Sequence, residues 1–135
     1  TSYKAKVGFV TQDIYLFQGS LRSNLAAGRD CTEAQIWAAL EQVDAIDFVR
    51  SMGGLDVKSA EAGRSLSGGE RRRLGLARIL LSGSDILIFD EVITGLDEVN
   101  KVAVLKVIER LSKTYVVVMI SHEKLSLSHS ASLLL

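Results

Sequence analysis

Apolar residues recur along the chain in patterns that predict its strands. Short runs of consecutive apolar residues predict strands at Val7 to Val10, Ile86 to Phe89, Tyr115 to Ile120 and Ala131 to Leu135. The two middle runs are unbroken, which is typical of strands covered on both faces of a parallel sheet. The stretch from Thr11 to Gly19 is predicted to be a loop.

Three segments are predicted to be helical. Thr32 and Ser67 each begin a helix, because Gln35 and Glu70, three residues later, complete a capping box. The first helical region ends at Gly53-Gly54, the second helix runs to about Leu81, and a third spans about Glu98 to Ser112. Helical spacing predicts buried sides formed by Ile36, Leu40 and Val43 in the first helix and by Val104, Val107, Ile108 and Leu111 in the third.

The order strand, helical insert, strand, helix, strand predicts an α/β fold with a parallel sheet. The stretch from Leu21 to Leu81 is too long for a plain crossover, so we expect it to form a lobe beside the sheet. Apolar runs lie almost at the first residue and at the last one, whereas natural domains usually end in polar segments. Both ends are therefore expected to be cut points in a longer chain.

Composition narrows the function classes. Lys+Arg and Asp+Glu balance at 16 each among 135 residues, which argues against a nucleic-acid or anionic-membrane footprint. A hydrophobic content of 47% is ample for one domain. Cys31 is the only cysteine, which favours a reducing compartment. No apolar run approaches the roughly 20 residues that span a bilayer, so any membrane-spanning part would lie elsewhere.

Two adjacent carboxylates follow the predicted strand Ile86 to Phe89. Ligands of open parallel sheets bind beyond the carboxyl ends of the strands. There Asp90 could hold Mg²⁺, which prefers oxygen ligands, and Glu91 could orient or deprotonate an attacking water. By itself this pattern is more often a strand that meets solvent.

A second candidate is the start of the helix at Ser67. The simple interpretation is a capping box with Glu70, in which the glycines only loosen the helix entry. However, two glycines in a first helical turn cost about 1 kcal/mol each relative to alanine in a helix interior. Gly68 and Gly69 would let a phosphate approach the backbone, where free N–H groups and the helix dipole attract anions.

Taken together, these motifs resemble those of ABC ATPases over nearly the whole chain. Leu66 to Glu70 resembles the LSGGQ/E signature, and Ile86 to Glu91 resembles the Walker B strand. Three further motifs follow the family order: Gln12 is similar to the Q-loop glutamine, Thr94-Gly95-Leu96-Asp97 to the D-loop, and His122 to the H-loop switch histidine. Coincidence is far less plausible for five ordered motifs than for any one of them.

Two further stretches are similar to the exporter subtype. Leu16 to Leu25 resembles the LFxGSIRxNI run that follows the Q-loop, and Glu61-Ala62-Gly63 resembles the X-loop, whose glutamate meets the coupling helices. Glu61 could equally be an exposed loop acid.

The resemblance implies a partial P-loop NTPase sheet with an inserted α-helical lobe. It divides the single partial domain into a core strand and Q-loop (1–19), a helical subdomain (20–82) and a Walker B, D-loop and H-loop core (83–135). It also implies a role in ATP hydrolysis for export, with Mg²⁺ as cofactor, at the cytoplasmic face of a membrane. A second ABC ATPase domain, in a homo- or heterodimer, and a transmembrane domain would be the partners, with no nucleic acid.

The family also implies a role for each matching residue. Glu91 and His122 would be catalytic, Asp90 and Gln12 would hold the metal, and Gln12 and Glu61 would couple to the transmembrane domain. Nucleotide would be bound by Gln12, Ser67, Gly68, Gly69, Glu70 and Asp97.

The sequence departs from the family in places. No GxxGxGKS/T motif occurs, and in the family this P-loop precedes the Q-loop, so the chain alone is expected to be inactive. Gly95 replaces the usual alanine of the D-loop. Two alternatives stay open: a soluble ABC ATPase of DNA repair, chromosome maintenance or translation, and a non-catalytic fold fragment. For Arg71, Arg72 and Arg73 we expect a solvated helix face rather than nucleic-acid contact.

Overall fold

Four parallel strands form the sheet of the computed structural model, in the spatial order β1-β2-β3-β4. The structure describes residues 6–11, 15–121 and 133–134. Along the chain the elements are β1 (Val7–Val10), α1 (Leu21–Ala26), α2 (Glu33–Gln42), α3 (Ile46–Ser51), α4 (Ser59–Ser65), α5 (Gly68–Leu81), β2 (Ile86–Asp90), α6 (Glu98–Leu111), β3 (Val116–Ser121) and β4 (Leu133–Leu134). The predicted α/β class with a parallel sheet is confirmed.

The register brings the carboxyl ends of three strands to one edge of the sheet. Val10 of β1 pairs with Phe89 of β2, and Asp90 pairs with Ile120 of β3. The residues that follow these strands therefore leave the sheet at the same edge, as the topology of open parallel sheets requires.

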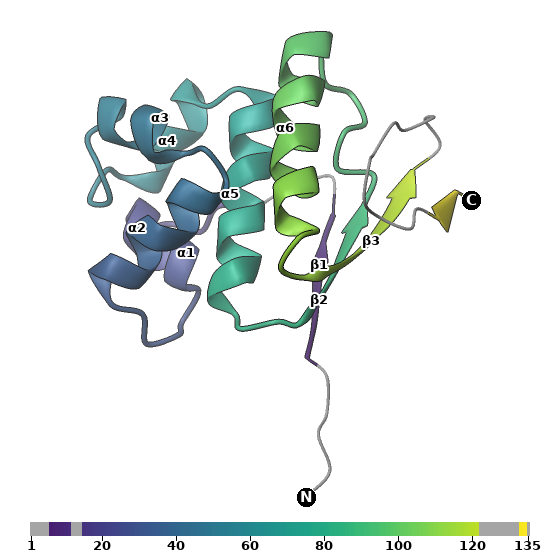
Figure 1. Cartoon of the computed structure of the whole chain (residues 1–135). Helices are drawn as coiled ribbons and strands as arrows, with labels where there is room; N and C mark the ends of the chain where they lie inside the picture. The colour runs from purple at the N-terminus through teal and green to yellow at the C-terminus, as the bar shows by residue number, and fades with distance from the viewer. Residues whose placement is uncertain (1–5, 12–14, 122–132, 135) are drawn as a thin grey trace, which may run out of the picture.

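The helical lobe lies beside the sheet, as the length of the insert predicts. Figure 1 shows α1 to α4 gathered on one side of α5, with α6 and the sheet on the other. Buried residues of the lobe, such as Leu21 and Leu40, belong to the same apolar cluster as Leu87 and Phe89 of β2. All four residues predicted to form the buried side of the last helix are at most 1% exposed: Val104, Val107, Ile108 and Leu111.

The first predicted helical region is interrupted. The residues between α2 and α3 turn through Asp44, whose φ is +57°. This left-handed residue allows Val43 and Ala45 on either side of it to be completely buried. Arg73 donates to the Asp44 carbonyl (2.9 Å) and Arg110 to its carboxylate (2.9 and 3.2 Å), which stabilises the turn.

The expectation that β2 and β3 are covered on both faces is wrong for the described part of the chain. Leu87, Phe89 and Met119 are buried, but their neighbours alternate with them as half-buried or exposed residues, and Val116 is 61% exposed. Phe9 on β1 pairs with Ile88 and is exposed on the same side. In this chain α5 and α6 cover only one face of the sheet.

Two further expectations concern the ends and the membrane. A strand is present at Leu133–Leu134, within the predicted stretch from Ala131 to Leu135; the other residues of that stretch lie outside the described part. In the part that the structure describes, no helix combines the length and the apolar character of a membrane span.

Candidate functional site

Asp90 and Glu91 lie where β2 leaves the sheet. Asp90 is the last residue of the strand and is half-buried. Glu91 has a φ of +58°, a conformation that is uncommon and costly for a residue other than glycine and that clusters at functional sites. Its amide donates to the carbonyl of Ile120 on β3 (2.9 Å), so the backbone stays anchored to the sheet while the chain turns away.

Thr94 holds the carboxylate of Glu91. Its hydroxyl donates a hydrogen bond to Glu91 Oε2, and its amide donates to the Glu91 carbonyl (3.3 Å). Residues 91 to 94 thus form a closed turn in which Thr94 contacts both the carbonyl and the carboxylate of Glu91. The sequence assigned Thr94 to the D-loop and did not predict this contact.

The two other residues expected at this edge, Gln12 and His122, lie outside the described residues. Val10 ends β1 two positions before Gln12, and Ser121 ends β3 directly before His122. The structure therefore places Asp90 and Glu91 at the carboxyl end of β2. For Gln12 and His122 it describes only the strands that precede them.

The start of α5 is a capping box, as predicted. The Ser67 hydroxyl accepts from the Glu70 amide (3.1 Å), and the Glu70 carboxylate accepts from the Ser67 amide (2.9 Å). The Ser67 hydroxyl also donates to Asn100 Oδ1 (3.3 Å). Glu70 is expected to bind nucleotide, but its Oε1 atom accepts the hydrogen bond from the Ser67 amide at the start of α5.

A side chain on either glycine of this turn would meet the segment formed by Leu96 and the start of α6. A Cβ atom on Gly69 would overlap the Asn100 side chain, 2.7 Å from its Cγ, and one on Gly68 would lie 3.0 Å from Leu96 Cδ2. Close packing between helices explains Gly69 without any phosphate. Gly68 is exposed and leaves room for a ligand on its outer side.

Asp97 caps α6. Its Oδ1 accepts from the amide of Asn100 (2.8 Å) and from Asn100 Nδ2 (3.0 Å). Asn100 therefore connects Asp97 to Ser67, and through it the predicted D-loop and signature lie side by side in one chain. The sequence singled out Asp97 and Ser67 but not Asn100, which has no motif of its own.

The expectation of a solvated arginine face is wrong. Arg72 is only 9% exposed and donates to the carbonyls of Val92 (2.5 Å) and Thr94 (3.0 Å). Arg71 donates to Gly63 (2.7 Å), and Arg73 to Asp44. Burial lowers the pKa of the Arg73 guanidinium, against the raising effect of Glu70 and Asp44. Long side chains on one helix can reach several distant segments, so a run of equal charges need not face solvent.

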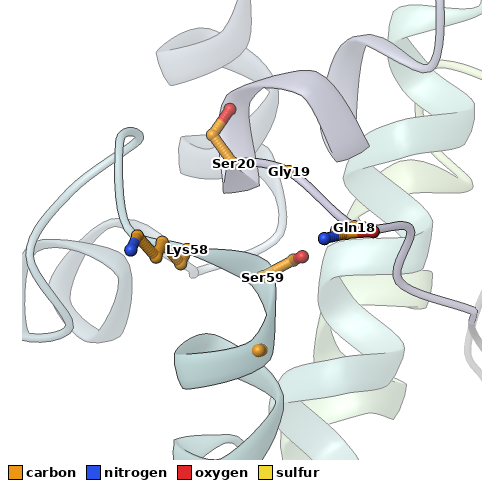
Figure 2. A pocket seen from close by; sticks show the side chains of 6 residues that line it. Gln18, Gly19, Ser20, Lys58 and Ser59 are labelled. Atoms are coloured by element: carbon orange, nitrogen blue, oxygen red, sulfur yellow. The ribbon is translucent and has the colours of Figure 1, made fainter.

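Glu61 is exposed in the first turn of α4, not in a loop as its motif suggests. The start of α4 borders a hollow of about 430 Å³ lined by Gln18, Gly19, Ser20, Lys58, Ser59 and Ala60. Figure 2 shows that these residues come from the ends of two segments, the loop before α1 and the entry to α4. The Ser59 amide donates to Gly19 (2.8 Å), and its hydroxyl to Phe17 (2.6 Å).

Asn24 explains part of the exporter-like run Leu16 to Leu25. The side chain is completely buried, accepts from the Phe17 amide (2.6 Å) and donates to the carbonyls of Phe17 (3.0 Å) and Ser20 (2.9 Å). The run thus folds the chain after the predicted Q-loop into a defined turn on α1.

One carboxylate at the sheet edge suits a hard cation. Within residues 6–11, 15–121 and 133–134 no group of three or more His, Cys, Asp or Glu side chains could hold a metal by themselves. No described side chain donates a hydrogen bond to Asp90, and Mg²⁺ commonly takes only one or two protein carboxylates together with waters and substrate phosphates. Among the described residues, Asp90 is therefore suited to serve as one ligand of such a site.

Sequence comparison gives concordant matches. A family model described as ABC transporter matches residues 1–94. An uncharacterized ABC transporter ATP-binding protein of Haemophilus influenzae is 42% identical over 123 residues, covering 90% of this chain and 22% of that protein. The Beta-(1-->2)glucan export ATP-binding/permease protein NdvA of Bradyrhizobium diazoefficiens is 36% identical over 135 residues, covering 99% and 22%. An ATP-dependent lipid A-core flippase of Desulfotalea psychrophila is 37% identical over 133 residues, covering 97% and 23%.

A solved structure agrees with these relatives. A bacterial Atm1-family ABC exporter with ATP bound matches with a TM-score of 0.72 and 32% identity, over 87% of this chain and 21% of that one. The chain spans about a fifth of the length of the curated relatives it matches.

Proposed function

This chain belongs to the ABC transporter family, in its exporter-type ATP-binding part, and from that premise we propose that it forms the signature and Walker B portion of an ATPase that drives export. The observation that carries the proposal is the direct packing of the Ser67 turn on Leu96 and Asn100, with Glu91 held at the carboxyl edge of the sheet. It brings signature, D-loop and Walker B residues into one connected unit.

In the proposed dimer the chain contributes to two ATP sites. Ser67, Gly68, Gly69, Glu70 and Asp97 would form the part of this chain that binds the ATP held by a second ABC ATPase domain. The exposed outer side of Gly68 at the start of α5 supports this role, because amides of a first helical turn attract anions.

The second site is formed with a P-loop of the same polypeptide, a motif that these 135 residues do not include. Gln12, Asp90, Glu91 and His122 act on the ATP held there. Asp90 and Gln12 would hold Mg²⁺, which neutralises phosphate charge when bound. Asp90 supplies a carboxylate that no described side chain engages.

Glu91 accepts the proton of the water that attacks in line, and the β–γ bond of ATP breaks. The Thr94 hydroxyl donates to one carboxylate oxygen of Glu91, which supports a fixed position of the base. His122 contacts the γ-phosphate. Catalysis in such sites is mainly positioning and charge stabilisation, so a preorganised Glu91 turn supports the assignment.

Coupling to transport would pass through Gln12 and Glu61 to a transmembrane domain at the cytoplasmic face of the membrane. The exposed position of Glu61, near the hollow between the entries to α1 and α4, supports this role. The division into 1–19, 20–82 and 83–135 is part of the proposal, with α5 as the element between lobe and sheet. The named export and flippase relatives make a soluble, non-transport ABC ATPase the less favoured alternative.

Glu91→Gln in the intact protein tests the proposal. The amide keeps the size of the side chain but cannot accept a proton, so single-turnover hydrolysis should fall by about 10²–10⁴-fold. ATP binding should persist, because the P-loop, metal and opposite signature are unchanged. The separate ATPase domain should then elute as an ATP-loaded dimer in size-exclusion chromatography.

Hydrolysis at the wild-type rate would show that Glu91 is not the base. Loss of ATP binding would instead make Glu91 a structural or metal-site residue. Absence of hydrolysis in the wild-type protein as well would support the non-catalytic alternative.

A further inference from the structure

Two hydrogen bonds of the buried Arg72 side chain reach one segment of the candidate site. Its guanidinium donates to the carbonyls of Val92 (2.5 Å) and Thr94 (3.0 Å), both in the segment between Glu91 and α6. A buried cation is costly unless it is paired or hydrogen-bonded, and hydrogen bonds from a charged donor are stronger than neutral ones. The segment is therefore held firmly at two points by one side chain of α5.

One of those two residues, Thr94, also contacts Glu91. Thr94 binds Glu91 twice, through its hydroxyl to Oε2 and through its amide to the carbonyl. Glu91 itself has a left-handed backbone, which persists only where its surroundings enforce it. Since Val92 and Thr94 lie within the turn that begins at Glu91, the two hydrogen bonds of Arg72 are well placed to enforce its conformation.

We propose that Arg72 is a positioning residue for Glu91, acting through the main chain of Val92 and Thr94 and the hydroxyl of Thr94. The inference rests on the proposed function, because Glu91 matters as a base only in an ATPase. It adds a physical link within one chain. The helix α5 carries the signature turn at its start, and Arg72, one turn further along the same helix, positions the catalytic carboxylate of Glu91.

The neighbouring arginines argue that this link is specific. Arg71 reaches Gly63 in α4, and Arg73 reaches Asp44 between α2 and α3. Only Arg72 of the three donates to the segment after Glu91 in the described part of the chain. The planar guanidinium of Arg72 donates to two carbonyls at once in a fixed geometry. A lysine ammonium on a flexible stem cannot reproduce that geometry.

The test is a double-mutant cycle on ATP hydrolysis by the intact protein. Arg72→Met should lower kcat by at least about tenfold, because misplacement of a catalytic group by about 1 Å can cost 10²-fold. KM for ATP should stay within about twofold, since the nucleotide contacts are elsewhere. The kcat of Arg72→Lys should lie between those of Arg72→Met and the wild type.

The decisive arm uses the Glu91→Gln background. If Arg72 acts through Glu91, Arg72→Met should cause no further loss of single-turnover rate there, because residues that act as a unit are strongly non-additive. A merely structural role would lower the rate by the same factor in both backgrounds. Arg110→Met is the matched control: its guanidinium binds Gln42 and Asp44, and kcat should stay near wild type.

Thr94→Val provides an independent arm in case Arg72→Met does not fold. It removes only the hydroxyl bond to Glu91 from a half-buried residue, and should lower kcat without changing KM. Provided that the wild type hydrolyses ATP, the inference is overturned if Arg72→Met keeps the wild-type kcat. It is also overturned if Arg72→Met lowers the single-turnover rate by the same factor in both backgrounds. If Arg72→Met is unfolded, full activity of Thr94→Val overturns it. An inactive wild type would instead refute the proposed function.

Discussion

A single methyl group at residue 69 would collide with Asn100, and this is the sharpest constraint on the signature turn. Gly69→Ala should therefore destabilise the ATPase domain by about 1–3 kcal/mol, the usual cost of overpacking. Alanine has the higher helix propensity, so propensity alone predicts the opposite sign. Urea denaturation of wild type and variant, monitored by circular dichroism, measures the difference.

Gly63→Ala is the matched control for that substitution. Gly63 is also helical, but its added Cβ would meet only ordinary contacts, at 3.7 Å from Arg71 and 3.8 Å from Leu16. It should be neutral or stabilise by up to about 1 kcal/mol. Combining Gly69→Ala with Asn100→Ala should cost less than the sum of the single variants. Strict additivity would contradict the packing explanation.

At the scale of elements, side chains cap the described helices α1, α2, α5 and α6. Capping boxes begin α1, α2 and α5 at Ser20, Thr32 and Ser67, and Asp97 caps α6. The boxes at Thr32 and Ser67 follow from the Ser/Thr-x-x-Glu/Gln pattern. Ser20 pairs with Ser23 instead, outside that pattern, and Asp97 was interpreted only as a nucleotide contact.

Thr32→Ala should destabilise the ATPase domain by about 1 kcal/mol, the typical cost of losing a hydroxyl N-cap. The Thr32 hydroxyl accepts from the Gln35 amide (3.1 Å), and alanine leaves that donor without its partner. The free energy of unfolding from urea titration gives the measurement. The control is Thr114→Ala, which changes an exposed threonine after α6. Its free energy of unfolding should stay within about 0.5 kcal/mol of the wild-type value. Equal losses in both variants would show that the cap adds nothing.

At the scale of the whole molecule, the 135-residue chain should not bind Mg-ATP with micromolar affinity. P-loop backbone donors and their lysine dominate phosphate binding in this superfamily, and these residues contain no such motif. Calorimetric titration tests this, with the complete ATPase domain as the positive control. A dissociation constant near 1 μM, about −8 kcal/mol, would contradict the expectation.

The sequence by itself determined the features that depend on near neighbours. Helical spacing identified the buried side of α6, the capping boxes at Thr32 and Ser67 join residues three apart, and an apolar run ending in Asp90-Glu91 located the sheet edge. These interactions follow from backbone periodicity, so a local pattern is sufficient to predict them. The ordered motifs also identified the family.

Only the tertiary structure decided what lies against each of these elements. Arg72 binds carbonyls 20 and 22 residues further along the chain, and the gap at Gly69 is filled by Asn100 from another helix. The open side of the sheet depends on which helices cover it, not on how apolar its strands are. Such partners are set by packing between distant segments, and neither the charge of an arginine nor the smallness of a glycine says which segment will meet it.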